Sequence, residues 1–323
     1  MKCIVKKLGI FLLLVSLAAG PLGCGGQPAL EQKYDIITTT DKYGIGVTKA
    51  SGNVPFFAEK LCVGGNENLL AEDVTANLSE AAGLFDVTDH AIVYANNIHK
   101  RLYPASTTKI LTAYLALKYG DLNATATVSE NALKLEEGST LCGVSAGDQL
   151  TLEQLLYGLM LCSGNDAAVV IAEMISGSVE EFAKLMNQEV QKLGATNSHF
   201  VNPHGLHDDE HYTTVYDLYL IFQAAMEEDT FRQVVSTATY STEFQNSRGQ
   251  TVKKLWTNSN RYIKGEEKAP EGVTVVGGKT GTTFNAGNCL VLYSENASGK
   301  PYISIVLKGT SRDNLYYQMT ELL

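Results

Sequence analysis

Two residues one helical turn apart, Ser106 and Lys109, have side chains that could perform nucleophilic catalysis. A serine hydroxyl is a weak nucleophile at neutral pH, so a base must take its proton. Residues three apart on a helix lie on the same face, which brings the Lys109 amine within reach of the Ser106 hydroxyl. The spacing therefore indicates Ser106 as a nucleophile and Lys109 as its general base.

Two later segments add further polar groups, a Ser-Gly-Asn run that begins at Ser163 and a Lys-Thr-Gly run that begins at Lys279. Lys109 can accept a proton only when it is neutral. Burial on an apolar helix and the like charge of Lys279 would both lower its pKa. The backbone amide of Ser106, at the N-terminus of a helix, could donate to the oxyanion that develops during acyl transfer.

The elements that position these residues have local signals. Pro104 is expected to end an extended stretch, and residues 106–119 to form a helix that Gly120 closes. The helix is apolar nearly all round, which predicts that it is buried. Three more helices are expected after Thr151, Ser178 and Thr214, whose side-chain oxygens can cap a first turn. The first two, with Gln154 and Glu181, are predicted to form full capping boxes, and Gly194 to close the second helix.

Strand patterns lie toward both ends of the chain. A hairpin is expected at residues 81–87 and 91–95, and further strands at 273–276, 289–293 and 302–307. A closing helix is expected at 314–323. The predicted fold class is α+β, an antiparallel β-sheet built from both ends of the chain and flanked by helices, with a helical region inserted between them. Trp256 and the aromatic cluster around Tyr216 are interpreted as core.

Four segments, 104–109, 163–167, 202–206 and 278–287, resemble those of the penicillin-binding protein and serine β-lactamase superfamily, and within it the low-molecular-weight D-alanyl-D-alanine carboxypeptidases. The resemblance covers residues 81–323 and implies a β-lactamase/transpeptidase-like fold. Residues 258–260 also resemble a family segment near the site, without an assigned role.

The resemblance implies hydrolysis of the terminal D-Ala-D-Ala bond of peptidoglycan stem pentapeptides through a Ser106 acyl-enzyme, with β-lactams as covalent inhibitors. Ser106, Lys109 and Ser163 would be catalytic, with Ser163 as proton relay to the leaving D-alanine. The Thr282 amide would be the second oxyanion donor. Substrate-binding residues would be Asn165, Lys279, Thr280, Gly281 and Thr282. No cofactor or metal is expected.

The beginning of the chain predicts export. Residues 1–23 read as a signal peptide, with a basic start and an apolar stretch too short to span a bilayer. Cys24 follows in a sequence that resembles a lipoprotein processing site, although Pro21 departs from it. Lipidation would hold the protein at the outer face of the membrane, and simple secretion is the alternative. Residues 24–80 are expected to form a tether and irregular extension, and 81–323 the catalytic domain.

Many carboxypeptidases of this family continue into a β-rich domain and an anchor helix, whereas this chain ends 42 residues after Gly281. Tethering is therefore expected at the N-terminus. The chain has 25 Lys and Arg against 35 Asp and Glu, and no basic run follows the leader, which argues against nucleic acid as a partner. The cysteines show no metal-ligand spacing. They are expected to form one or two disulfides or to be buried as free thiols.

Three other functions remain to be weighed. His204, His207 and His211 could bind zinc, although the stretch after His204 looks like a solvated polar loop. A class A β-lactamase would need a Glu-x-x-Leu-Asn segment between the second and third motifs, and none occurs. A penicillin-binding sensor or wall-binding scaffold would keep the fold without the activity, but the intact catalytic set argues against it.

Overall fold

The larger sheet joins strands from the two ends of the chain. The computed structural model describes residues 59–72, 74 and 77–323. Within them, the sheet has the order β2-β1-β9-β8-β7, and each neighbouring pair is antiparallel. Its strands are β1 (Ala81–Asp86), β2 (Ala91–Asn96), β7 (Thr274–Thr283), β8 (Gly287–Glu295) and β9 (Pro301–Gly309). The predicted sheet is therefore confirmed, and strand β7 lies at its edge.

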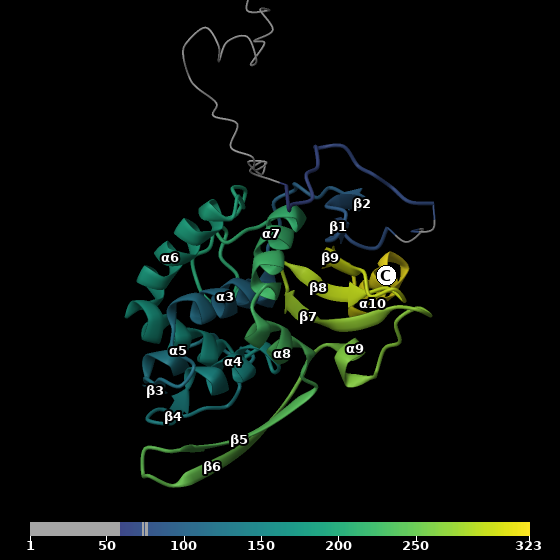
Figure 1. The fold of residues 1–323 in the computed structure, drawn as a ribbon. Helices are drawn as coiled ribbons and strands as arrows, with labels where there is room; N and C mark the ends of the chain where they lie inside the picture. Colours follow the sequence, from purple (N-terminus) through teal and green to yellow (C-terminus); the bar gives the residue numbers. More distant parts are fainter. Residues whose placement is uncertain (1–58, 73, 75–76) are drawn as a thin grey trace, which may run out of the picture. The chain divides into compact units, whose positions relative to one another are not determined.

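Both faces of this sheet are covered (Figure 1). Because side chains alternate along a strand, Val291 of β8 packs into the main core, whereas its neighbours Leu290 and Leu292 pack against Met319. Met319 belongs to α10 (Arg312–Leu322), which covers one face. The other face contacts α7 (Val215–Met226) and α8 (Asp229–Ser236).

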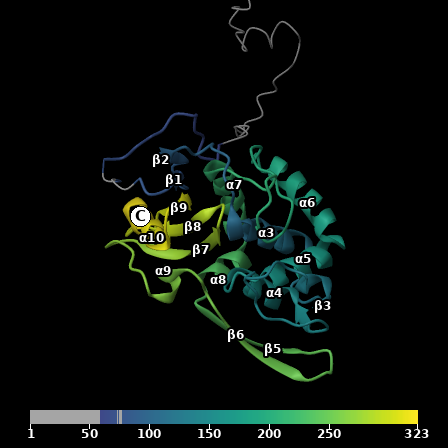
Figure 2. The same cartoon turned by 180° about the vertical axis from the view of Figure 1, so that it is seen from behind.

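The helical block between the two groups of strands contains the predicted helices. Around the buried α3 it places α4, α5 and α6, as seen from both sides in Figures 1 and 2. Ser178 caps α6 through the Glu181 amide, but the Glu181 side chain pairs with Lys184, so the predicted capping box is wrong there and confirmed at Thr151. The bounds are α3 (Lys109–Tyr119), α4 (Leu152–Met160), α5 (Asn165–Ser176) and α6 (Val179–Lys192).

The helix that carries the candidate nucleophile begins differently from the prediction. Ala105–Thr108 forms a 3₁₀ turn, η1, and the α-helix starts only at Lys109. Ala105 has a φ of 49°, a left-handed conformation that non-glycine residues rarely adopt. This strained entry directs the turn toward strand β7, which η1 contacts.

A second sheet in the inserted region was not predicted. It has the order β3-β4-β5-β6, and its long β5–β6 hairpin extends away from the helices (Figure 1). Trp256 of β6 is buried, as expected, and its indole Nε1 donates to the Cys142 carbonyl at 2.9 Å. The bounds are β3 (Thr125–Thr127), β4 (Gln149–Thr151), β5 (Thr239–Gln245) and β6 (Thr251–Thr257); the short elements are η2 (Asn131–Leu133) and α9 (Arg261–Lys264).

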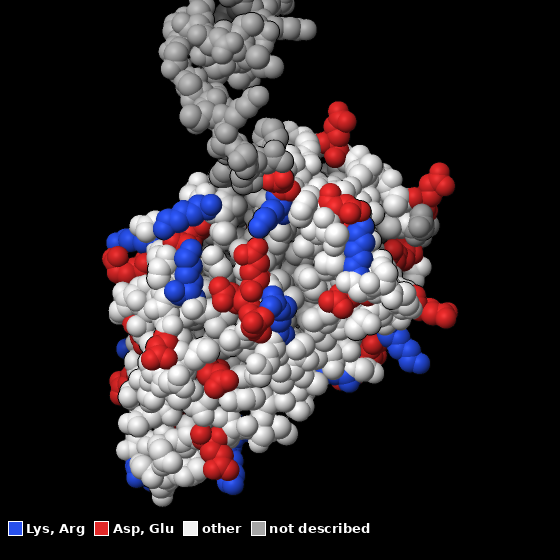
Figure 3. Space-filling model, in the orientation of Figure 1, with Lys and Arg blue, Asp and Glu red and all other residues white. Residues whose placement is uncertain are grey.

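The predicted signal peptide and Cys24 lie outside the described residues. From residue 59 the chain packs on the domain, since Cys62 bonds through its backbone to the Tyr216 and Tyr219 hydroxyls. No helix within the described part is long and apolar enough to cross a bilayer. On the face in Figure 3 basic and acidic side chains are interspersed, and Glu80, for example, pairs with both Lys100 and Lys308.

Candidate active site

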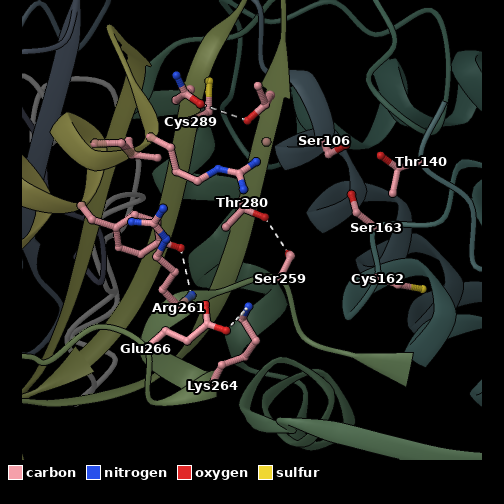
Figure 4. A pocket seen from close by; sticks show the side chains of 16 residues that line it. Ser106, Thr140, Cys162, Ser163, Ser259, Arg261, Lys264, Glu266, Thr280 and Cys289 are labelled. Atoms are coloured by element: carbon pink, nitrogen blue, oxygen red, sulfur yellow. Dashed lines mark hydrogen bonds and ion pairs between the residues drawn. The ribbon is translucent and has the colours of Figure 1, made fainter. Parts of the chain in front are cut away.

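The three sequence segments meet at one pocket of about 260 Å³. Ser106 lies in η1, Ser163 in the connection between α4 and α5, and Thr280 on β7 (Figure 4). The pocket therefore lies where the edge strand of the large sheet faces the helical block.

Lys109 is fully buried and its Nζ has three polar neighbours. They are Ser106 Oγ at 3.0 Å, Asn165 Oδ1 at 2.6 Å and the His204 carbonyl at 2.6 Å. Burial, and then repulsion from Lys279, hold the pKa of Lys109 well below its usual range. A neutral amine has two hydrogens and one lone pair. The two oxygen acceptors can take the hydrogens, which leaves the lone pair for the Ser106 hydroxyl.

Lys279 is the second buried amine of the site. Its Nζ donates to Ser163 Oγ at 3.0 Å and to the Thr280 carbonyl at 2.8 Å. Burial lowers the pKa of Lys279 to about 7. Thr280 Oγ1 is in turn 2.7 Å from Ser259 Oγ, which gives residues 258–260 a place in the site. The Lys279 side chain is thus held between Ser163, in the connection between α4 and α5, and the backbone of its own strand.

Gly281 allows β7 to approach η1, the catalytic turn that carries Ser106, closely. A Cβ at this position would lie 3.0 Å from the Ser106 and Thr107 nitrogens and from the Pro104 carbonyl oxygen. Only a glycine fits this contact without displacing backbone. The approach places the Ser106 amide beside the strand that carries Thr282, so two amides from different elements can share one oxyanion.

The Ser163 connection is fixed by its surroundings. Ser163 has a φ of 62°, and Asn165 begins α5 with its amide donating to the Thr140 carbonyl at 2.8 Å. The buried Asp166 carboxylate accepts the amides of Cys142 at 2.8 Å and Gly143 at 3.0 Å. These bonds tie α5 to the neighbouring loop and set the direction of Ser163 and Asn165.

The histidine segment contributes backbone and packing, and part of the prediction for it was wrong. His211 is buried, not solvated, and its Nε2 lies 2.8 Å from Thr108 Oγ1. Burial lowers the pKa of both His204 and His211 to about 3. Gly205 has a φ of 87°, and a Cβ there would lie 1.8 Å from the Ala105 carbonyl. The segment thus packs against the turn that carries the candidate nucleophile Ser106.

Sequence reasoning missed several of these contributions. The His204 carbonyl, the His211–Thr108 bond and Ser259 were not assigned, although residues 202–206 and 258–260 were singled out by resemblance. Among the described residues, no three His, Cys, Asp or Glu side chains converge on a metal position. The four described cysteines are free thiols, which agrees with the second of the two alternatives and not with a disulfide among them.

Comparison with known proteins places this geometry in a family. The family profile described as D-alanyl-D-alanine carboxypeptidase matches residues 70–311. The chain belongs to the D-alanyl-D-alanine carboxypeptidase family. It is 32% identical to the Bacillus subtilis carboxypeptidase DacF over 77% of this chain. It is 34% identical to a Streptomyces carboxypeptidase over 68% of this chain and 77% of that protein.

Solved structures of this carboxypeptidase family and its neighbours agree with the fold. The Streptomyces K15 DD-transpeptidase matches with a TM-score of 0.71 and 29% identity, covering 76% of this chain and 95% of that one. The confirmed α+β fold is therefore that of the DD-peptidases. The chain spans less than two thirds of some of its relatives, 62% of DacF and 58% of the Escherichia coli carboxypeptidase DacC.

Proposed function

We propose that the chain hydrolyses the terminal D-Ala-D-Ala bond of peptidoglycan stem pentapeptides and releases D-alanine. The observation that carries this proposal is the position of Lys109 Nζ, 3.0 Å from Ser106 Oγ and hydrogen-bonded to two other oxygens. This arrangement supports a neutral lysine that accepts the serine proton. Family membership supports the substrate class.

Acylation begins when Ser106 Oγ attacks the carbonyl of the penultimate D-alanine and its proton passes to Lys109. The Ser106 and Thr282 amides stabilise the oxyanion of the tetrahedral intermediate. When the intermediate collapses, the peptide bond breaks and an ester to Ser106 remains. The leaving D-alanine nitrogen takes a proton from Ser163, and the proton held by Lys109 restores the Ser163 hydroxyl. The 3.0 Å contact with Lys279 supports this role, because a cation beside Ser163 Oγ favours proton release.

Selectivity for a chain end rests on Lys279. A protonated amine pairs with the terminal carboxylate, a charge that peptide bonds inside a chain lack. The Thr280 and Thr282 hydroxyls assist, Gly281 gives the strand room beside Ser106, and Asn165 orients the substrate amide with its donor and acceptor. Four of these positions, residues 279–282, lie on β7, an edge strand of the large sheet.

Water then hydrolyses the acyl-enzyme. Penicillins acylate the same serine, and their slow release makes them inhibitors. The one carboxylate that lines the described pocket, Glu266, pairs with Lys264 at 2.7 Å. Because it is paired with Lys264, Glu266 is not assigned the role of activating a deacylating water. Rapid turnover of penicillin would contradict this assignment in favour of a β-lactamase.

The test is D-alanine release from a pentapeptide that ends in D-Ala-D-Ala. The Ser106→Ala variant should release none and bind no fluorescent penicillin, while a Ser247→Ala variant, at an exposed turn, should retain both. Penicillin labelling without D-alanine release by the unaltered chain would show a sensor. Loss of release with EDTA but not with penicillin would show a zinc enzyme.

For placement, we propose residues 1–23 as a signal peptide and Cys24 as a lipidated first residue. Residues 24–80 would be the tether and extension, of which the part from residue 59 packs on the domain, and 81–323 the catalytic domain. The charge pattern of the leader and the resemblance around Cys24 support this. A Cys24→Ala variant should move from the membrane fraction to the medium. An unaltered distribution in the medium for both proteins would show simple secretion.

A further inference from the structure

Two cysteines beside the pocket, Cys142 and Cys162, both place their sulfurs against Gly158. Each thiol also shifts the pKa of the other. Cys162 Sγ donates to the Gly158 carbonyl at 3.0 Å, and a Cβ at Gly158 would lie 3.2 Å from Cys142 Sγ. Both thiols therefore lie next to the same glycine.

The two cysteines differ in access. Cys142 is 6% exposed, whereas Cys162 is only partly buried and lines the pocket next to Ser163 (Figure 4). The hydrogen bond from Cys142 lowers the pKa of the Cys162 thiol, and the same bond, with burial, raises the pKa of Cys142. A partly exposed cysteine with a lowered thiol pKa, beside a second cysteine, is the arrangement found in redox-sensitive sites.

Cys142 is the fixed member of the pair. Its amide donates to Asp166 and its carbonyl accepts from Trp256 at 2.9 Å. A Cβ at Gly164 would lie 2.8 Å from its Cβ, so no space remains on that side. Any adjustment needed to join the sulfurs therefore falls on Cys162, and through the chain on Ser163.

We propose that Cys142 and Cys162 form a reversible thiol–disulfide pair whose oxidation displaces Ser163 and slows acylation of Ser106. The oxidant is a low-molecular-weight disulfide. The Cys162 thiolate attacks it, forming a mixed disulfide and releasing one thiol. Cys142 then loses its proton and attacks Cys162 Sγ, releasing the second thiol. Two protons and two electrons leave the protein, and the oxidant is reduced to two thiols.

Oxidation also changes the charge at the site. A Cys162 thiolate raises the pKa of Lys279, opposing the effect of burial. A disulfide carries no such charge. The protonated form of Lys279, which is proposed to bind the substrate carboxylate, is then less favoured.

The bond is tested by treating the full chain with oxidised glutathione, blocking free thiols, and digesting without reduction. Cleavage after Glu153 separates the two cysteines, so a peptide pair linked through Cys142 and Cys162 is expected. Cys142→Ala and Cys162→Ala should each abolish the link, and Cys62→Ala, a buried thiol that bonds to the Asp86 carbonyl, should retain it. No link, or a mixed disulfide that persists on Cys162, overturns the proposal.

The effect on the site is tested by the rate of labelling with fluorescent penicillin. The oxidised chain should acylate about tenfold more slowly, because displacements below 1 Å in a catalytic site have effects of this order. Dithiothreitol should restore the rate, and Cys162→Ala should show no response to the oxidant. A linked chain that acylates at the unaltered rate refutes the effect on Ser163. This readout rests on the proposed role of Ser106, whereas peptide mapping does not, so the two can fail separately.

Discussion

The close approach of β7 to the catalytic turn makes Gly281→Ala an informative substitution. The added Cβ would meet three backbone atoms, the Ser106 and Thr107 nitrogens and the Pro104 oxygen, each at 3.0 Å. Comfortable contact needs roughly 3.5 Å, so strand and turn must separate by about half an ångström. None of the three atoms belongs to a flexible side chain. The strain must therefore move the elements themselves.

This separation widens the gap between the Ser106 and Thr282 amides that are proposed to bind the oxyanion. If a displacement of 1 Å costs ~100-fold in rate, half of it costs ~10-fold. We therefore expect acylation by fluorescent penicillin to slow about tenfold in Gly281→Ala. Overpacking should also lower the free energy of unfolding by about 1–3 kcal/mol. Acylation is followed by rapid quenching and gel fluorescence, and stability by urea unfolding.

The matched control is Gly65→Ala, where a Cβ would meet nothing within 4 Å. Both acylation and stability should be unchanged in this variant. Two results would refute the reasoning for Gly281. One is an unaltered acylation rate in a folded variant. The other is a fractional loss of acylation rate equal to the fraction of the variant that urea unfolding shows to be unfolded. Either would show that the close approach does not set the geometry of the oxyanion site.

Three further outcomes are expected. Lys109→Met should slow acylation at least ~100-fold without preventing folding, as loss of a general base does; quenched labelling checks it. Because the pKa of Lys279 is about 7 and its protonated form binds the carboxylate, KM for the pentapeptide should rise above pH 7, by up to about tenfold per pH unit. Burial raises the pKa of Glu189, but hydrogen bonds from Lys118 and Lys192 outweigh it and bring it to about 2. Its stabilisation should therefore be lost as pH falls below its ordinary value of 4.5, and Glu189→Gln should flatten the urea-unfolding profile in that range.

Each of these outcomes has a contrary result. A Lys109→Met variant that acylates at the normal rate would remove Lys109 as the base. A pH-independent KM would show that Lys279 does not bind the carboxylate as a titrating cation. An acid-unfolding profile unchanged by Glu189→Gln would show that its ion pairs are already broken, or worth nothing, in the folded protein.

The parts of the fold with local signals could be predicted from the sequence. Thr151 caps α4 because its hydroxyl and the Gln154 side chain need only the backbone beside them. In the second sheet, β3 and β4 had no such signal, since they have three residues each. Its connection to the hairpin is the pairing of Gln149 with Gln245. A pairing between such distant residues is set by the surrounding tertiary structure, not by a local pattern.

The same distinction applies to the site. Ser106, Lys109 and Lys279 were identifiable as candidates because their side chains can perform the proposed chemistry. The His204 carbonyl was not, because every residue has a carbonyl and only the fold brings this one to 2.6 Å from Lys109 Nζ. His211 lies among polar residues and was expected in solvent. Its ring nitrogens instead find Thr108 Oγ1 and the Val201 amide, which offsets the cost of burial.

The order of the forces on Lys109 decides how the base can work once substrate is bound. Repulsion from Lys279 helps to keep Lys109 neutral, yet a bound carboxylate would cancel much of the Lys279 charge. If repulsion were the main cause, the base would become protonated just as catalysis begins. Burial is the larger cause, and a substrate that fills the pocket excludes more water and strengthens it. Lys109 is therefore expected to remain a base in the complex, because α3 and the His204 carbonyl keep it out of water independently of the charge proposed to select the substrate.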